Sequence, residues 1–276
     1  MANALDIVEA VKRNKSITVA KIAEVIEDFA PKSLQESYDN AGLQVGDPDM
    51  PVSAVMLCLD FTEDILDEAI ERECNMVISH HPLLFRGLKE ITGADPIQRM
   101  VIKAIRSGIA LYSAHTNLDS ATDGVSFEMS RMLGMTNVKV LQPVAPGTET
   151  GLGVIGEIKP TPKMEFLRTV KETFNVKGLR YSEFTPKLVI KRVALCGGAG
   201  ASLIKDAITA GADAIITGDV KYHDFTGYGH KILIADIGHY ESELCARQIF
   251  SRIIRDKFSE LPIYFSAKEK NPISVL

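Results

Sequence analysis

VMLCLDFTEDILDEAIERECNMVISHH, residues 55–81, recurs without a gap as VALCGGAGASLIKDAITAGADAIITGD, residues 193–219. In each copy, two apolar runs flank a segment whose apolar residues repeat at helical spacing, so each copy is predicted to form a strand, a helix and a second strand. The identical pairs are Val55/Val193, Leu57/Leu195, Cys58/Cys196, Ala69/Ala207, Ile70/Ile208 and Ile78/Ile216. This agreement indicates an internal duplication of a βαβ unit.

A second correspondence follows each copy. IALYSAHTNLD, residues 109–119, matches LIADIGHYESE, residues 233–243, and pairs a histidine and a carboxylate of each segment: His115 with His239 and Asp119 with Glu243. Because the carboxyl ends of strands are where open α/β sheets bind ligands, these side chains are candidates for a site. We predict duplicated α/β units with mixed sheets flanked by helices, and a metal site in the cleft between the two halves.

The rest of the chain completes two intertwined domains. Residues 1–128 with 240–276 are expected to form the first domain and residues 129–239 the second. The Pro, Gly and Thr cluster at 143–151 indicates a connector. Helices are predicted for ITVAKIAEVIEDFAP at 17–31, for TPKMEFLRTVKETF with Thr161 as its N-cap, and for ESELCARQIFSRIIRDKF at 241–258. Strands are predicted for GLGVIGEI, KLVIKRVALCGG and PIYFSA.

Composition limits the class of protein. With 276 residues, 46% of them hydrophobic, the chain can bury the cores of one large or two medium domains. A net charge of −5 argues against nucleic acid or an anionic membrane as the main partner. The N-terminal segment lacks the apolar run of a secretory signal, and no run reaches the 18 or so residues of a membrane span. We expect a cytoplasmic protein whose four cysteines are reduced core thiols.

The pair His80 and His81 ends an apolar strand just before Pro82. Adjacent side chains on a regular strand point to opposite faces, but the alternation stops at a strand end, where both rings can turn toward one cavity. Imidazole and carboxylate groups bind first-row divalent metals, and two ions about 3.5 to 4 Å apart are typical of metal-assisted hydrolases. With His115, Asp119, His239 and Glu243, the pair predicts a dinuclear site in which Glu243 is the bridging candidate.

Three loops and two further histidines allow a structural and a functional interpretation. GGAGAS at 197–202 is consistent with a phosphate cradle or with close packing of strand on helix. SYDNAGLQVGD at 37–47 is consistent with a shaped loop or a plain turn. GDVKYHDF at 218–225 aligns with the histidine pair, so its polar residues are either substrate contacts or solvated loop residues. His223 and His230 taken singly are more typical of structural residues.

Several of these motifs together resemble one family. ESYDNAGLQVGD, ISHHPLLFRGLKEI, YSAHTNLDSATDGVS, GGAGASL, TGDVKYHDF and DIGHYESE occur in the order found in the Nif-three-like family, also called the GTP cyclohydrolase I type 2 homologues. The resemblance runs from about residue 17 to the C-terminus. It implies a dinuclear metal centre whose ligands fall on His80, His81, Asp119, His239 and Glu243. His115 lies beside the site in this pattern and supports the ligands.

The resemblance also implies an activity and an assembly. Two divalent ions per chain, Zn, Mn or Fe, would activate a hydroxide for attack on the guanine imidazole ring of GTP, with His115 or His223 moving protons. The alternatives are hydrolysis of another nucleotide or phosphoester, and a non-catalytic role in metal handling or as a scaffold. A small-molecule substrate is expected, with no membrane partner. By analogy with the family we expect a homo-oligomer, a toroidal hexamer.

Overall fold

The computed structural model describes residues 17–183, 185, 186 and 188–276, and these form two compact units. The first unit contains the described residues up to Leu118 together with Ala246–Lys270, and the second contains Asp119–Cys245 and Asn271–Leu276. The sequence-based boundaries lie at 128/129 and 239/240. In the structure the second unit begins at Asp119, so it contains helix α6, Val125–Met132, which packs on strands of that unit. The prediction that residues 1–16 carry no secretory signal lies outside the described residues.

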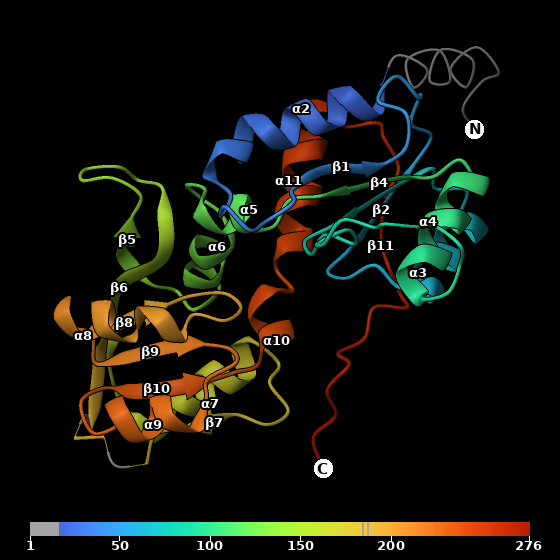
Figure 1. The fold of residues 1–276 in the computed structure, drawn as a ribbon. Helices are drawn as coiled ribbons and strands as arrows, with labels where there is room; N and C mark the ends of the chain where they lie inside the picture. Colours follow the sequence, from blue (N-terminus) through green and yellow to red (C-terminus); the bar gives the residue numbers. More distant parts are fainter. Residues whose placement is uncertain (1–16, 184, 187) are drawn as a thin grey trace, which may run out of the picture. The chain divides into compact units, whose positions relative to one another are not determined.

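The first unit is built on a five-stranded mixed sheet with the strand order β1-β4-β3-β2-β11 (Figure 1). Four strands are parallel, and β1 pairs antiparallel with β4. All of the strands are short. Their bounds are Gly42–Val45 for β1, Val55–Cys58 for β2, Met76–Ser79 for β3, Ala110–Ser113 for β4 and Ile263–Phe265 for β11.

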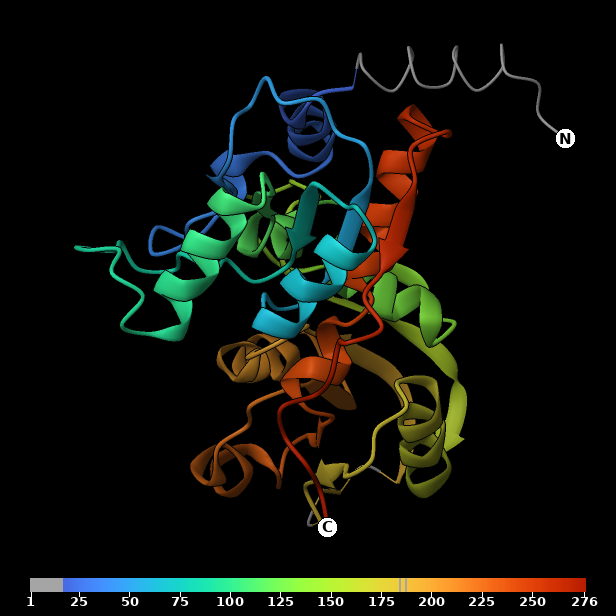
Figure 2. The same ribbon diagram turned by 90° about the vertical axis from the view of Figure 1, so that its right-hand side faces the viewer.

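Helices cover both faces of this sheet. Helices α3 (Glu63–Glu71) and α4 (Pro96–Arg106) pack with Met56 and Cys58 of β2, and Figure 2 shows the two helices side by side. Because side chains alternate along a strand, Val55 and Leu57 lie on the opposite face. There α11 (Ala246–Lys257) packs against β2, and it also contacts α2 (Val19–Phe29). Three of these helices begin at a side-chain N-cap, supplied by Thr18, Thr62 and Asp95.

The second unit has a six-stranded mixed sheet with the order β5-β6-β8-β9-β10-β7. Its central strands β8, β9 and β10 are parallel, and the other pairings are antiparallel. The strands are Thr136–Pro143 for β5, Gly151–Pro162 for β6, Arg180–Tyr181 for β7, Val189–Leu195 for β8, Ala214–Thr217 for β9 and Leu233–Asp236 for β10. The helices are α6, α7 (Lys163–Thr173), α8 (Ile204–Thr209), α9 (Tyr222–Tyr228) and α10 (His239–Glu243).

The strand register confirms the duplication. Val55 of β2 lies opposite Met76 of β3, and Val193 of β8 lies opposite Ala214 of β9, so the same shift of 138 residues relates both members of the pair. The third strands differ by one residue. Met76 pairs with Ala110 and Ala214 pairs with Leu233, a shift of 123 between Ala110 and Leu233. The predicted match of His115 with His239 needs a shift of 124, so the second copy has one additional residue between strand and histidine.

Two predicted elements differ from the structure. The segment 241–258 forms the C-terminal part of α10 and then a separate helix, α11, because the helix beginning at His239 ends at Glu243. Thr161 is not an N-cap: β6 continues to Pro162 by pairing with β8, and Pro162 itself precedes α7. Strand β5 was not anticipated. In the part of the chain described here, no helix combines the length and apolar character that crossing a bilayer requires.

Candidate metal centre

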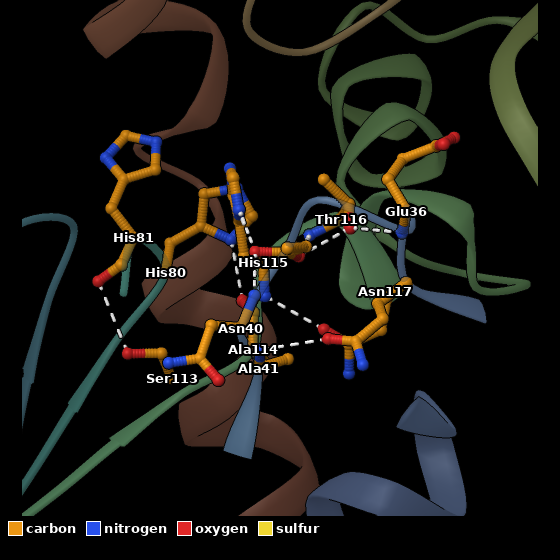
Figure 3. A network of polar contacts seen from close by, with 12 residues as sticks. Glu36, Asn40, Ala41, His80, His81, Ser113, Ala114, His115, Thr116 and Asn117 are labelled. Atoms are coloured by element: carbon orange, nitrogen blue, oxygen red, sulfur yellow. Dashed lines mark hydrogen bonds and ion pairs between the residues drawn. The ribbon is translucent and has the colours of Figure 1, made fainter. Parts of the chain in front are cut away.

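Polar side chains follow the carboxyl ends of three neighbouring parallel strands of the first unit, with histidines after two of them and an aspartate after the third. Strands β2, β3 and β4 end at Cys58, Ser79 and Ser113, and the residues that follow them include Asp60, the pair His80 and His81, and His115. The rings of His80 and His81 have centroids 5.1 Å apart, and each lies 5.3 Å from the ring of His115. Figure 3 shows the backbone around this cluster. The strand ends therefore bring three imidazoles together.

The backbone beyond β3 is held so that both adjacent rings can lie in this cluster. The amide of His80 donates to the carbonyl of Cys58, and the amide of His81 donates to the carbonyl of Leu59. The hydroxyls of Ser79 and Ser113 both donate to the carbonyl oxygen of His81, at 2.5 and 3.3 Å, and Figure 3 draws the bond from Ser113. These bonds explain how two consecutive side chains escape the alternation of a regular strand.

Each histidine of the candidate set presents its Nδ1 to an oxygen. His80 Nδ1 lies 2.9 Å from the carbonyl oxygen of Ala114, a bond drawn in Figure 3. In the other three, Nδ1 lies 2.8 Å from a carboxylate oxygen: Asp60 for His81, Asp39 for His115 and Asp219 for His239. Carbonyls and ionised carboxylates only accept, so Nδ1 carries the proton and Nε2 carries the lone pair in the neutral ring. This tautomer is the one that ligates a metal through Nε2.

Asp39 is the most strongly held of these carboxylates. Its side chain is fully buried, and it accepts hydrogen bonds from His115 Nδ1 and from the amide and hydroxyl of Thr116, at 2.8, 3.0 and 2.5 Å. Burial alone would raise the pKa of this carboxyl, but the bonds from His115 and Thr116 outweigh it and hold the pKa well below its usual range. Asp39 is therefore ionised at neutral pH and fixes the orientation of the His115 ring.

The second unit places its own set at the equivalent strand ends. Asp219 follows β9 and has a φ of 54°, a left-handed backbone conformation that few non-glycine residues adopt. Its carboxylate holds His239, the first residue of α10. One helical turn later, Glu243 Oε2 lies 2.9 Å from His239 Nε2. Both atoms carry lone pairs in the neutral ring and the ionised carboxylate, so the arrangement requires a cation, either a proton or a metal ion.

The glycine-rich loop of the second unit packs around Glu243. Gly198 has a φ of 59°, and a Cβ there would lie 2.1 Å from Glu243 Oε1. The Gly198 amide donates to the hydroxyl of Ser242 at 2.9 Å. A Cβ on Gly200 would come within 2.5 Å of Cys196 Cβ and Thr217 Oγ1. Close packing, the structural interpretation of GGAGAS, thus accounts for these two glycines.

Asp119 belongs to the same unit as Glu243. The two carboxylates offer ligand atoms within 4.8 Å of one another. Burial raises the pKa of the Cys196 thiol, and the charges of Asp119 and Glu243 raise it further, so both carboxylates act on one thiol. Asp119 lies on helix α5, Thr116–Ser120, one turn beyond His115.

The predicted site residues thus fall into two groups, each described within its own unit. His80, His81 and His115 offer ring nitrogens within 4.8 Å of one another in the first unit, a spacing that can hold a metal ion. The second unit contributes Asp119, His239 and Glu243. The ring of His115, predicted to lie beside the ligands, is 5.3 Å from the ring of His80, and the ring of His81 is 5.1 Å from it. His223 is exposed on α9, and its described ring contact is with Tyr222.

Sequence reasoning did not single out the carboxylates that orient the rings. Asp60 and Asp39 lie 21 and 76 residues from the histidines they hold, so no local spacing connects them. Asp219 belongs to the GDVKYHDF loop that aligns with the histidine pair, but this alignment does not predict its bond to His239. For Asp60 a signal existed: it follows the end of a predicted strand, as the histidines do.

In this duplicated α/β fold, histidine and carboxylate side chains at the strand ends form groups that could hold a metal ion. The chain matches the model of the Duf34/NIF3 (NGG1p interacting factor 3) family over residues 17–272, and it belongs to this family. It is 38% identical to the GTP cyclohydrolase 1 type 2 homolog of Clostridium acetobutylicum, over 90% of this chain and 93% of that protein. It is 31% identical to NIF3-like protein 1 of Drosophila melanogaster, over 92% and 88% of the two chains.

Solved structures agree with this assignment. The fold is similar to that of the hypothetical protein SA1388 of Staphylococcus aureus, with a TM-score of 0.86, 26% identity and coverage of 94% of this chain and 99% of the other. It is also similar to reduced HcgD of Methanocaldococcus jannaschii, with a TM-score of 0.77, 28% identity and coverage of 90% and 97%.

Proposed function

We propose that the protein is a metal-dependent hydrolase that opens the imidazole ring of the guanine base of GTP. Its relatives named GTP cyclohydrolase 1 type 2 homolog, at 36 and 38% identity in two Clostridium species, support the substrate. The metal dependence is supported by the side chains at the strand ends. One observation carries it: four histidines present Nδ1 to oxygen acceptors, which leaves Nε2 as the ligating nitrogen in every one.

The proposed ligands are His80 and His81 from the first unit and Asp119, His239 and Glu243 from the second. This set of three imidazoles and two carboxylates suits Zn, Mn or Fe. Bound ions would supply Lewis acidity, polarising a water molecule and the base it attacks.

His115 is proposed to carry the proton. Asp39 holds its Nδ1 proton, so its Nε2 can accept a proton from the water that attacks C8 of guanine. The new bond joins the water oxygen to C8 and the C8–N9 bond breaks. One proton of the water goes to N7, and the other, carried by His115, goes to N9. The base is left with a formylated amine at N7, and a second water releases formate. Asp39 orients the ring and stabilises its protonated form throughout.

The first experiment measures the metal. Protein purified without chelator is analysed for bound metal as wild type, as Glu243→Ala and as Glu241→Ala, a control that removes the same charge from the same short helix. We expect about two ions per chain in wild type and in the control. In Glu243→Ala the metal content should fall sharply. Wild-type protein that binds no metal after reconstitution with Zn, Mn and Fe would contradict the proposed function.

The second experiment measures the reaction. Formate release and loss of the guanine absorbance are followed with GTP and metal-loaded protein, beside a known GTP cyclohydrolase as positive control. His115→Ala is expected to lower kcat by roughly 100-fold or more while keeping the metal, since general acid–base groups contribute about that much. A metal-loaded wild type that is inactive on GTP but active on another nucleotide would reject the substrate and retain the hydrolase.

A further inference from the structure

A cavity of about 430 Å³ lies in the second unit, between the end of the glycine-rich loop and the start of helix α9. Ser202 lines it from the end of the loop and Lys205 from the following helix, α8. Tyr228 lines it from α9, and Lys221 lines it from the position just before α9. The small side chains of Ala199 and Ala201 form the rest of the loop side, which keeps the space open. The cavity joins the two loops, GGAGAS and GDVKYHDF, that the metal ligands alone do not explain.

The charged groups of this cavity are unevenly engaged. Asp219 is bonded to His239, and Asp224 accepts a hydrogen bond from the backbone amide of Lys221 at 3.1 Å. By contrast, the ammonium groups of Lys205 and Lys221 form no ion pair or hydrogen bond with the described part of the chain, and both residues are exposed. The carboxylates are therefore occupied within the protein, while two lysines and two residues with hydroxyl groups, Ser202 and Tyr228, also line the cavity.

Two ammonium groups and two hydroxyls around one open space fit an anion with many oxygen atoms. Lysine is a common phosphate ligand because it acts as a compact point charge with three donors. One wall of the cavity is Asp219, the same carboxylate that holds His239. An anion bound here lies beside Asp219, the carboxylate that orients a candidate metal ligand.

We propose that this cavity binds the phosphate chain of the nucleotide substrate, with Lys205 and Lys221 as its cationic contacts. The inference rests on the proposed function for the identity of the substrate and assigns the part of the molecule that the metal ligands do not. Guanosine, which lacks the phosphates, gains nothing from this cavity.

The test compares two double variants that remove the same charge. Lys205→Ala/Lys221→Ala changes the cavity, and Lys171→Ala/Lys177→Ala removes two exposed lysines elsewhere in the same unit. Binding of tripolyphosphate, GTP and guanosine is measured by calorimetry at fixed ionic strength, since screening changes long-range attraction. Metal content is measured before and after, because tripolyphosphate chelates divalent ions. Thermal unfolding confirms that both variants fold.

We expect the cavity variant to bind tripolyphosphate and GTP at least tenfold more weakly than wild type, and guanosine equally well. The control variant should change by less than twofold. Equal losses in the two variants, or a wild type that binds no tripolyphosphate at millimolar concentration, would overturn the inference. Different results would contradict the proposed function, namely protein that binds no metal or releases no formate from GTP. If either of these is found and the cavity variant still loses tripolyphosphate binding selectively, the anion site is supported and the hydrolase activity is rejected.

Discussion

The two copies of the βαβ unit share a strand register but place different side chains at the same strand ends. The first copy has His80 and His81 after β3, and the second has Gly218 and Asp219 after β9. The backbone of His239 lies against Gly218, where a Cβ would come within 2.7 Å of the amide nitrogen of His239. The second copy therefore leaves no room for a side chain at the position that His80 occupies in the first.

The two copies share the strand register but differ in which positions carry the candidate ligands and which carry the carboxylate that orients them. In the first copy, imidazoles are the candidate ligands and a carboxylate, Asp60, orients one of them. In the second copy, the aligned position itself became the orienting carboxylate, Asp219, and the candidate ligands moved to α10. Both copies therefore end with a carboxylate on a histidine Nδ1, reached from different positions.

The largest expected effect comes from breaking the difference at Gly218. Gly218→Ala adds a Cβ against the backbone of residues 238 and 239, and overpacking against backbone costs about 1–3 kcal/mol or more. We expect a fall in thermal midpoint of at least several degrees. The control is Gly227→Ala, where a Cβ meets nothing within 4 Å in helix α9. A Gly218→Ala protein as stable as this control would show that the close approach does not exclude side chains.

The orienting carboxylates give the next effect. Asp60→Asn and Asp219→Asn keep the shape of the side chain but remove the charge that fixes each histidine tautomer. Loss of such a partner typically weakens metal binding by about 10- to 100-fold. Competition with a chromophoric chelator measures the change in metal affinity. The control is Asp206→Asn, which removes a charge from helix α8 of the second unit. If only one of the two variants weakens binding, the two copies do not support the metal equivalently.

A third difference concerns the carboxylates at equivalent positions of the two repeat helices, Glu68 and Asp206. Glu68 is buried and accepts hydrogen bonds from Ser266, Ala267 and Lys268, whereas Asp206 is half-buried and its described side-chain bond, with Gln142, is 3.4 Å long. We expect Glu68→Gln to lower the free energy of unfolding by about 1–3 kcal/mol, because it weakens bonds to a charged group. Asp206→Asn should change it by less than about 0.5 kcal/mol.

The Glu68 contribution should also depend on pH. Burial would raise the pKa of its carboxyl, but the bonds from Ser266, Ala267 and Lys268, with the nearby Arg72, lower it below the ordinary value. A lowered pKa stabilises the folded state above the unfolded value of about 4.3, and this contribution is lost as the pH falls further. Denaturant unfolding at pH 7 and pH 3 should therefore show a gap between wild type and Glu68→Gln that narrows in acid. A constant gap would contradict this account.

The smallest expected effect concerns two free thiols at equivalent positions of the two copies, Cys58 and Cys196. Both are buried, and burial raises the pKa of each well above its usual range. Since the thiolate is the reactive form, we expect neither to be alkylated at pH 8 in the native protein. Mass spectrometry after brief iodoacetamide treatment measures this, with full modification in denaturant as the control. Rapid native labelling of Cys196 alone would show that the second copy opens more readily than the first.

The sequence allowed much of this comparison to be anticipated. The gapless recurrence of 55–81 predicted both βαβ units, and the double histidine before Pro82 predicted a strand end with two rings on one side. All four cysteines are free and buried, as expected. These features are local or repeat at constant spacing, so they can be recognised in one dimension.

Other features depend on contacts that no spacing encodes. The pairing of Asp39 with His115 joins residues 76 positions apart, and the carboxylate is recognisable only from the hydrogen bonds around it. The additional residue before His239 is invisible in an alignment of histidine with histidine, and only strand register shows it. Helix α10 ends at Glu243 although the sequence continues with helix-forming residues, so the sequence pattern alone does not mark this boundary.

Strand β11 has a consequence for the order in which the protein is made. It pairs with β2, yet its residues 263–265 are synthesised some 200 positions later, after nearly all of the second unit. During translation β2 therefore keeps an open edge, and α11 is missing from one face of the sheet. Unpaired strand edges and uncovered apolar faces promote aggregation. The emerging chain exposes the edge of β2 and one apolar face of the sheet until α11 and β11 have been synthesised. A chaperone that shields such surfaces should therefore raise the yield of folded protein most at that stage.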